Sequence, residues 1–223
     1  MKIALIGGTG DIGEGLALRW GRETDHDILI GSRSKEKAEE RVTAYVERLR
    51  AAGRKGELRI TGMANEDAAA QGDVVVLCVE AAHAPASVHA LLPHFNPSQV
   101  LVSPAVPMVR RGKFFYYAPP AEGSLAVQIA GILPADMPVV GAFHTVPAHK
   151  LADLKADLDQ NVVVLGGSEG AKKTVMTLVA QITGLIPLDG GPLSASALVE
   201  SIAPLLINLA IVNKRKNLAI KFV

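Results

Sequence analysis

The sequence predicts an α/β protein of the Rossmann type, with a doubly wound, mostly parallel sheet and a smaller C-terminal α/β domain. Three observations support this class. Short apolar segments alternate with stretches of helical periodicity, which is the pattern of βαβ units. Hydrophobic residues make up 49% of the 223 residues and aromatic residues only 4%, so the core must come mainly from aliphatic side chains, as parallel strands covered on both faces require. A glycine-rich segment directly follows the first apolar run, as in nucleotide-binding folds.

The first two thirds of the chain alternate between strand and helix patterns. Asp73–Val79 is rich in valine and is predicted to be a central strand, buried on both faces. The other strands are expected at Lys2–Ile6, Asp27–Ile30, Leu58–Thr61, Val100–Val102 and Val139–Ala142. The helices are expected at Asp11–Gly21, Lys35–Ala52, from a capping Asn65 through Ala70, at His83–Leu92 and near Glu122–Leu133.

The pattern changes after Pro147, and we place a domain boundary near residue 150. Residues 1–150 form the predicted dinucleotide-binding domain and residues 151–223 the smaller one. Two strands, Val162–Leu165 and Leu185–Leu188, are expected around a helix at Glu169–Ile182. Leu193–Val212 is apolar around nearly its whole circumference, so we expect this helix to be buried between domains or between subunits.

Composition excludes several classes of protein. The 23 Lys and Arg residues against 22 Asp and Glu leave a net charge of +1, which argues against nucleic-acid binding by bulk charge. A single cysteine, Cys78, excludes a disulfide framework and a cysteine zinc cluster, and is expected to be inert packing. We expect no apolar run to approach the roughly 18 residues of a membrane helix, and the N-terminus does not resemble a signal peptide. A cytoplasmic protein without nucleic-acid or membrane partners is therefore expected.

The glycine-rich segment predicts dinucleotide binding. Gly8, Gly10 and Gly13 form a GxGxxG pattern between the first strand and the first helix. In this pattern the first glycine allows a tight turn, the second lets the backbone approach a pyrophosphate, and the third permits close helix–strand packing. The alternative is a merely structural glycine-rich turn. The candidate cofactor-binding residues of this segment are Gly8, Thr9, Gly10, Asp11, Ile12 and Gly13.

The end of the second predicted strand favours NADP over NAD. NAD enzymes usually place an acidic residue there to bind the ribose 2′-hydroxyl, but Asp27 lies at the wrong end of the strand. Ser32, Arg33 and Lys37 instead offer a hydroxyl and two cations for a 2′-phosphate. The alternative is a solvated helix start, with Lys37 facing water.

Several motifs together resemble the coenzyme F420-dependent NADP reductases of archaea and some bacteria, and the resemblance runs nearly end to end. They are Gly7-Gly8-Thr9-Gly10, Gly31-Ser32-Arg33, Ile60-Thr61-Gly62-Met63, Val102-Ser103-Pro104, Ala142-Phe143-His144-Thr145-Val146-Pro147-Ala148, Pro187-Leu188-Asp189, Leu198-Val199-Glu200-Ser201 and Ile220-Lys221-Phe222. The resemblance implies NADP on the N-terminal domain, a deazaflavin in a cleft closed by the C-terminal domain, a homodimer and an archaeal, methanogenic setting. Where the family commonly has a proline and an aromatic residue, this chain has Glu80-Ala81-Ala82-His83, so the nicotinamide contacts are expected to differ.

The chemistry implied by the resemblance is hydride transfer between C5 of the reduced deazaflavin and C4 of the nicotinamide. Both reactive centres belong to cofactors, so no metal and no catalytic side chain are expected, with His144 the one candidate. The protein's task is positioning, which can supply roughly 7–11 kcal/mol of the barrier.

The cleft is expected at the carboxyl ends of the strands, where a doubly wound sheet binds ligands. The candidates are Val79, Ala81 and His83 after the fourth strand, Ser103, Val106 and Pro107 after the fifth, and His144, Thr145, Val146, Pro147 and Ala148 after the strand ending at Ala142. His144 either hydrogen-bonds a polar edge of the deazaflavin or is a structural histidine that bonds the backbone. His83 is either a ligand or a helix-start residue.

Two basic clusters could meet the phosphate and glutamate tail of coenzyme F420, or could be solvated surface. They are Arg110, Arg111 and Lys113, and Lys214, Arg215, Lys216 and Lys221. Two other functions stay open from the sequence. One is an NADP-dependent reductase of an imine, a keto acid or a metal chelate, and the other is a non-enzymatic NADP-sensing module.

Overall fold

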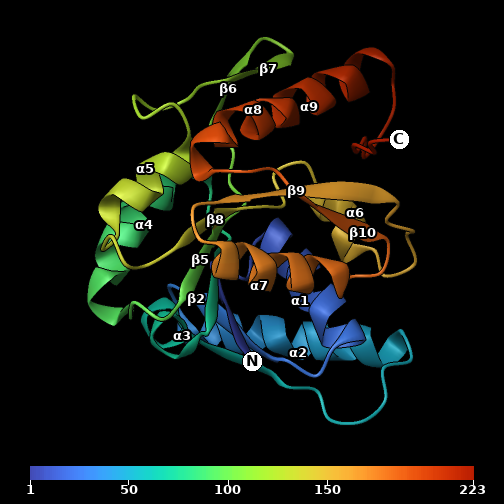
Figure 1. The fold of residues 1–223 in the computed structure, drawn as a ribbon. Helices are drawn as coiled ribbons and strands as arrows, with labels where there is room; N and C mark the ends of the chain where they lie inside the picture. The colour runs from blue at the N-terminus through green and yellow to red at the C-terminus, as the bar shows by residue number, and fades with distance from the viewer.

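The computed structural model describes residues 1–223 as an eight-stranded sheet with helices on both faces, together with a two-stranded hairpin (Figure 1). The strand order in the sheet is β10-β9-β8-β5-β4-β1-β2-β3. The strands are β1 (Lys2–Ile6), β2 (Asp27–Ser32), β3 (Ile60–Ala64), β4 (Val74–Leu77), β5 (Val100–Ser103), β8 (Val139–Gly141), β9 (Gln160–Gly166) and β10 (Leu185–Asp189), with β6 (Met108–Arg111) and β7 (Phe114–Tyr117) in the hairpin.

The helices follow the predicted alternation. They are α1 (Asp11–Glu23), α2 (Lys35–Ala51), α3 (Asn65–Gln71), α4 (Ala84–Leu91), α5 (Leu125–Ile132), α6 (Ala148–Ala152), α7 (Glu169–Ala180), α8 (Ser196–Glu200) and α9 (Ile202–Val212), with short 3₁₀ turns η1 (Ala81–His83), η2 (Leu92–His94) and η3 (Leu193–Ala195). The predicted Rossmann-type class is confirmed. The third strand lies later in the chain than predicted, and the short helix α6 was not predicted.

Six strands, from β8 across to β3, run parallel, and the chain crosses from one side to the other between β1 and β4. Ligands bind at such a switch point in doubly wound folds, at the carboxyl ends of the strands. β9 pairs antiparallel with β8, and β10 pairs parallel with β9. The same sheet therefore continues across the predicted boundary near residue 150, and the division into two domains stays a prediction.

Trp20 joins the first helix to the C-terminal part of the chain. Its side chain is fully buried, and its indole N–H donates a hydrogen bond to the carbonyl of Leu178 at 2.9 Å. The ring of Phe143, just after β8, meets it edge to face at a centroid distance of 5.9 Å. One hydrophobic cluster thus contains α1, α7 and the loop after β8, so these elements are packed as one body.

The predicted cap of α3 is wrong. The helix begins at Asn65 itself, with Ala64 in the capping position and no side-chain cap. The side-chain oxygen of Asn65 accepts a hydrogen bond from the backbone N–H of Gly7 at 3.1 Å. Asn65 is therefore a tertiary brace of the loop after β1, a role that local sequence patterns do not encode.

The hairpin of β6 and β7 was not predicted. It turns at Gly112, whose φ of +60° favours glycine. The side chain of Asn208, on α9, pairs with the backbone of Phe115 in both directions, with distances of 2.8 Å and 2.7 Å. Figure 1 shows the hairpin beside α9, at the end of the sheet that α8 and α9 cover.

The segment Leu193–Val212 differs from the prediction in two ways. It consists of η3, α8 and α9 rather than one regular helix, and in the single chain one face is exposed, with Leu198 72%, Leu205 53% and Val212 63% accessible. The structure therefore does not bury this face between domains of the chain, and burial between subunits stays a prediction. The segment is also long and apolar enough to pass the length and composition test for a membrane span, and 28% of the tested window is buried. The expectation that no apolar run approaches this length is therefore wrong. Glu200 lies within the segment and is fully buried.

Candidate functional site

The loop between β1 and α1 has the close backbone contacts that its glycines predict. The left-handed residue is Gly7, with φ +69°, whereas the tight turn was predicted at Gly8. The turn therefore lies one residue earlier than predicted. Gly8 is needed because a Cβ there would lie 2.8 Å from the carbonyl oxygen of Leu5. A Cβ on Gly13 would lie 2.5 Å from the Cα of Gly8, so helix α1 begins in direct contact with the loop.

Two side chains brace this loop from elsewhere in the fold. The hydroxyl of Tyr45, on α2, donates to the carbonyl of Gly8 at 3.1 Å, and burial raises the pKa of this phenol. Asn65 accepts from Gly7, as described above. The phosphate loop is therefore held in position by the protein itself, which lowers the entropy cost of binding a ligand there.

Gly10 is open to solvent on the side where a ligand would approach. The nearest atoms to a Cβ at this position are backbone oxygens at 3.5 Å and 3.8 Å, and helix α1 starts at the next residue without a side-chain cap. Its first N–H groups and the positive end of its dipole suit an anion. Thr9 is half-buried and Asp11 is exposed on the same loop. These features fit a pyrophosphate group.

Two cations, Arg33 in the loop after β2 and Lys37 in the first turn of α2, have no ion-pair partners. Arg33 and Lys37 are exposed and form no salt bridge, whereas Lys35 pairs with Glu39 at 3.7 Å. The hydroxyl of Ser32 accepts from the N–H of Ser34 at 3.4 Å. A 2′-phosphate at this strand end would meet the Arg33 fork without displacing an internal partner.

A cavity of about 600 Å³ lies at the carboxyl ends of the strands and under α9. Two of its lining residues are Ile12, in the first turn of α1 directly after the glycine loop, and Val79, just after β4, so the cavity adjoins the predicted dinucleotide site. The predicted residues that line it are Ile12, Val79, Val106, His144, Thr145, Val146, Pro147 and Ala148. Ala81, His83, Ser103 and Pro107 do not line it, and His83 is exposed at the end of η1.

The other wall of the cavity comes from residues that the sequence analysis did not single out. Ala203, Leu206, Ile207 and Ala210 form one stripe of α9 with the i, i+3, i+4, i+7 spacing of a helix face. That spacing was available in the sequence, but the helix is apolar on all sides and the pattern did not show which face is internal. The remaining lining residues are Pro104, Ala105, Met108, Phe143, His149, Ile211, Arg215, Asn217 and Leu218.

His144 is placed at the cavity by a strained turn. Phe143 has φ +67°, a conformation that is uncommon for a bulky residue and persists because packing against Trp20 holds it. His144 is 7% exposed, and neither ring nitrogen has a hydrogen-bond partner in the protein. Burial lowers its pKa from 6.5 to about 4, so the ring is neutral at neutral pH. No backbone bond of the kind expected for a structural histidine is present.

The two basic clusters differ in their position. Arg110, Arg111 and Lys113 lie over aromatic rings of their own hairpin, at 5.9 Å, 5.4 Å and 5.2 Å from the ring centroids, and none of them lines the cavity. In the C-terminal cluster, Lys221 pairs with Asp159 at 2.7 Å. Arg215 is the one arginine or lysine that lines the cavity.

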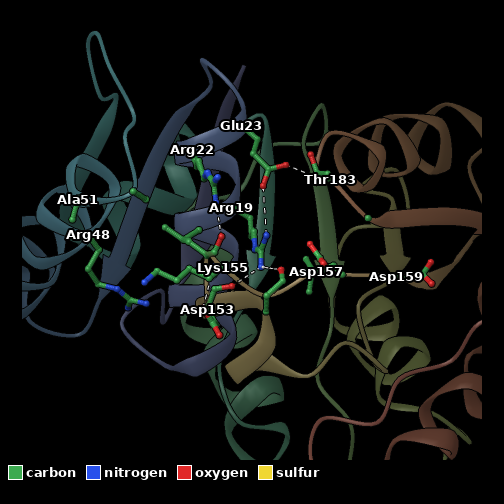
Figure 2. A pocket seen from close by; sticks show the side chains of 15 residues that line it. Arg19, Arg22, Glu23, Arg48, Ala51, Asp153, Lys155, Asp157, Asp159 and Thr183 are labelled. Carbon is green, nitrogen blue, oxygen red and sulfur yellow. Dashed lines mark hydrogen bonds and ion pairs between the residues drawn. The ribbon is translucent and has the colours of Figure 1, made fainter.

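A second, larger cavity of about 1130 Å³ lies between α1 and the loop of residues 153–159 (Figure 2). Its buried arginine is already engaged, because Arg19 donates to the carbonyls of Leu151 at 2.9 Å and Asp153 at 2.7 Å. Arg22 donates to the carbonyl of Leu154 at 2.5 Å. Figure 2 shows both arginines reaching from α1 toward this loop. These hydrogen bonds hold the loop against α1. Neither the glycine loop nor the carboxyl ends of the strands line this cavity.

Comparisons with known proteins agree on one family. Residues 2–107 match the family model described as NADP oxidoreductase, coenzyme F420-dependent. The chain is 39% identical to the F420-dependent NADP reductase of Methanocaldococcus jannaschii over 99% of this chain and 97% of the relative. It is 34% identical to the protein of the same name from Methanothermobacter thermautotrophicus, over 99% and 94%. A solved structure from Arthrobacter sp. FB24, assigned to the F420-dependent NADP reductases, superposes with a TM-score of 0.82 at 25% identity, over 100% of this chain and 99% of that one.

Gly10→Val tests the position of the phosphates. The new side chain has room in the fold, since its Cβ meets no atom closer than 3.5 Å, but it occupies the side from which a pyrophosphate approaches. We expect a folded protein whose affinity for NADP falls at least about 100-fold, measured by calorimetry. The matched control is Gly13→Ala, which should lower the melting temperature because its Cβ cannot be accommodated. Normal NADP binding by the Gly10→Val protein would place the phosphates elsewhere.

His144 should make the stability of the fold depend on pH. Its pKa in the folded chain, about 4, lies below its ordinary value of 6.5, so the unfolded chain takes up the proton first as the pH falls. The free energy of unfolding therefore falls as the pH is lowered through this range, by about 2 kcal/mol between pH 7 and pH 5. Urea unfolding of the wild type and of His144→Gln at both pH values measures this contribution as a difference. An equal pH dependence in the two proteins would show that the folded ring titrates normally.

Proposed function

The chain belongs to the F420-dependent NADP reductases, and from this premise we propose that it catalyses reversible, direct hydride transfer between C5 of reduced coenzyme F420 and C4 of the NADP nicotinamide. The observation that carries the proposal is the adjacency of two sites. Ile12 and Val79 lie at the glycine loop and at the end of β4, and they also line the apolar cavity under α9. A dinucleotide on the loop would therefore direct its nicotinamide end toward the cavity.

The mostly apolar lining of the cavity suits a ring system. Val146 and Pro147 line it after β8, and Ala203 and Ala210 on α9 contribute small side chains to the lining. When bound, the reduced deazaflavin supplies the hydride and NADP accepts it. The residues of the chain orient the two rings and exclude water, which strengthens the few polar contacts that remain.

His144 is not suited to acid–base work at neutral pH. It is the titratable group most enclosed at the cavity, and its lowered pKa, about 4, keeps the ring uncharged. A neutral imidazole can donate one hydrogen bond and accept another. We assign it to holding a polar edge of the deazaflavin rather than to proton transfer.

Cations at the two ends of the site support the identity of the two co-substrates. Arg33 and Lys37 lie unpaired at the end of β2, where the 2′-phosphate of NADP would lie. Arg215 lines the cavity, where it can meet the acidic tail of coenzyme F420.

The exposed face of α8 and α9 supports a cytoplasmic homodimer as the working form. Leu198, Leu205 and Val212 would otherwise leave a large apolar surface in water. A second copy on this face would also account for an apolar segment of membrane-spanning length. The segment contains a buried carboxylate, Glu200, which is hydrogen-bonded to Tyr117, Leu125 and Ala126. An archaeal, methanogenic setting is the one we propose, after the two Methanocaldococcus and Methanothermobacter relatives.

A spectroscopic assay tests the proposed reaction. The protein is mixed with reduced coenzyme F420 and NADP, and the return of the deazaflavin's visible absorbance is followed together with the formation of NADPH. We expect both signals to rise in equal amounts, and to be lost in Gly10→Val. NADP binding without turnover would favour the sensing module, and turnover only with an imine, a keto acid or a metal chelate would favour the other class of reductase.

Arg33→Ala should change the preference between nucleotides. Loss of a charged hydrogen bond to the 2′-phosphate should weaken NADP binding by about 1.5–3 kcal/mol, while NAD binding stays nearly constant. Lys35→Ala is the control, because Lys35 pairs with Glu39. Equal losses for NADP and NAD would remove Arg33 from the phosphate site.

Arg215→Gln should act on coenzyme F420 alone. We expect KM for F420 to rise about tenfold, the effect of one charged contact, with KM for NADP unchanged. A deazaflavin without the phosphate and glutamate tail should show no such rise. Arg110→Gln, on the hairpin and outside the cavity, is the matched control, and an equal rise for the tail-less compound would contradict the assignment.

The oligomeric state can be measured directly. Sedimentation should find a dimer, and Leu205→Asp, on the exposed face of α9, should convert it to a monomer that keeps its NADP affinity. A monomer at every accessible wild-type concentration would contradict the homodimer.

A further inference from the structure

The short strand β8 leaves one side of β9 open at the edge of the sheet where the cavity lies. β10 pairs with the first five residues of β9, but β8 pairs only with Leu165 and Gly166. Because β8 and β9 are antiparallel, the start of β9 extends past the carboxyl end of β8. The N–H of Gln160 donates to Gly184, just before β10, at 3.1 Å, so the N–H of Asn161 points to the open side.

The segment that follows α9 occupies this open side. The N–H of Asn161 donates to the carbonyl of Ile220 at 2.8 Å. The side-chain oxygen of Asn161, which is only 5% exposed, accepts from the N–H of Phe222 at 2.7 Å. Both carboxylate oxygens of Asp159 accept from Lys221 at 2.7 Å. Three consecutive residues are therefore fastened to the start of β9 and the loop before it.

The beginning of the same segment belongs to the cavity. Residues 217–223 form a strap, whose first two residues, Asn217 and Leu218, line the cavity. Figure 1 shows the chain turning from the end of α9 back toward β9. Lys214 and Asn217 have φ of +52° and +53°, a conformation that costs energy in residues other than glycine and persists where the surrounding structure fixes it. The bonds to Asn161 supply that constraint.

The charges around the strap suit an anionic ligand. Four cations and no acidic residue lie between positions 213 and 223. They are Lys214, Arg215, Lys216 and Lys221. Only Lys221 forms an ion pair, and Arg215 lines the cavity. The fastening therefore uses one cation and leaves three unpaired at the turn before the strap, where they can attract a negatively charged group.

We propose that the strap is a wall of the deazaflavin site and that Asn161 is the positioning residue that holds this wall in place. The inference rests on the proposed function, because coenzyme F420 is the ligand it concerns. Asn161 does not line the cavity itself, so it acts on the ligand only through the strap. Release of the strap would displace the apolar side chain of Leu218 and the charge of Arg215 together, whereas the glycine loop that receives NADP would stay as it is.

Asn161→Leu tests the positioning role. The apolar side chain is similar in size but accepts no hydrogen bond from Phe222. We expect KM for coenzyme F420 to rise about tenfold, with KM for NADP unchanged. Unlike Arg215→Gln, this variant should also raise KM for a deazaflavin without the phosphate and glutamate tail, because Leu218 is displaced as well. An equal rise in KM for NADP would show a general structural defect and overturn the inference.

A charge reversal tests the same fastening at an exposed position. Asp159→Lys places a second cation against Lys221, and we expect KM for coenzyme F420 to rise about threefold, as suits an exposed pair. Adding Lys221→Asp restores the pair with its signs exchanged and should restore KM. Asp157→Lys is the matched control, because Asp157 is exposed in the same loop and should leave KM unchanged. If melting temperatures show that Asn161→Leu does not fold, these variants carry the test.

Amide hydrogen exchange measures the fastening without any ligand. The N–H of Phe222 should exchange at least about tenfold more slowly in the wild type than in Asn161→Leu. Fast exchange in the wild type would overturn the inference, and so would an unchanged KM for coenzyme F420 in a variant whose strap exchanges fast. If the wild type showed slow exchange but no turnover with coenzyme F420, the proposed function would fail, and the strap would stand as a fastened wall of a cavity for another ligand.

Discussion

The close approach of helix α1 to strand β1 is the constraint on which the site depends. With a Cβ on Gly13 only 2.5 Å from the Cα of Gly8, no residue but glycine permits this packing. The approach directs the first N–H groups of the helix at the end of β1, and it brings Trp20 into the core, where its ring meets Phe143. The left-handed turn at Phe143 in turn places His144 at the cavity. One helix thus positions both the glycine loop and a residue of the cavity.

The C-terminal helices complete the cavity through polar contacts rather than through hydrophobic burial. The carboxylate of Glu200 accepts from the N–H groups of Leu125 and Ala126, at 3.0 Å and 3.1 Å, and from the hydroxyl of Tyr117 at 2.8 Å. It binds the start of α5 and the hairpin at once, and burial raises its pKa. Asn208 pairs with the hairpin backbone. These contacts hold α9 over the strand ends while its outer face stays exposed in the single chain.

Local patterns predicted much of this structure, since the glycine loop, the valine-rich β4 and most helices depend on periodicity and turn chemistry. The role of the cations after β2 could likewise be predicted, because no acidic residue stands where NAD enzymes usually place one for the ribose. The contacts of Tyr45 and Asn65 with the loop could not, because they join residues 37 and 58 positions apart. The hairpin was missed because its strands have four residues each, and the exposure of α9 because an all-apolar helix does not reveal its inner face.

The central claim is that the chain positions two rings for direct hydride transfer and contributes no proton relay. Reduced coenzyme F420 with deuterium at the donor carbon C5 tests it, with NADP as acceptor and the deuterium content of the NADPH measured by mass spectrometry. The account predicts that the label arrives on C4 of the nicotinamide without loss, because a hydride passed between stacked rings does not meet water. Appearance of the label in solvent would contradict direct transfer.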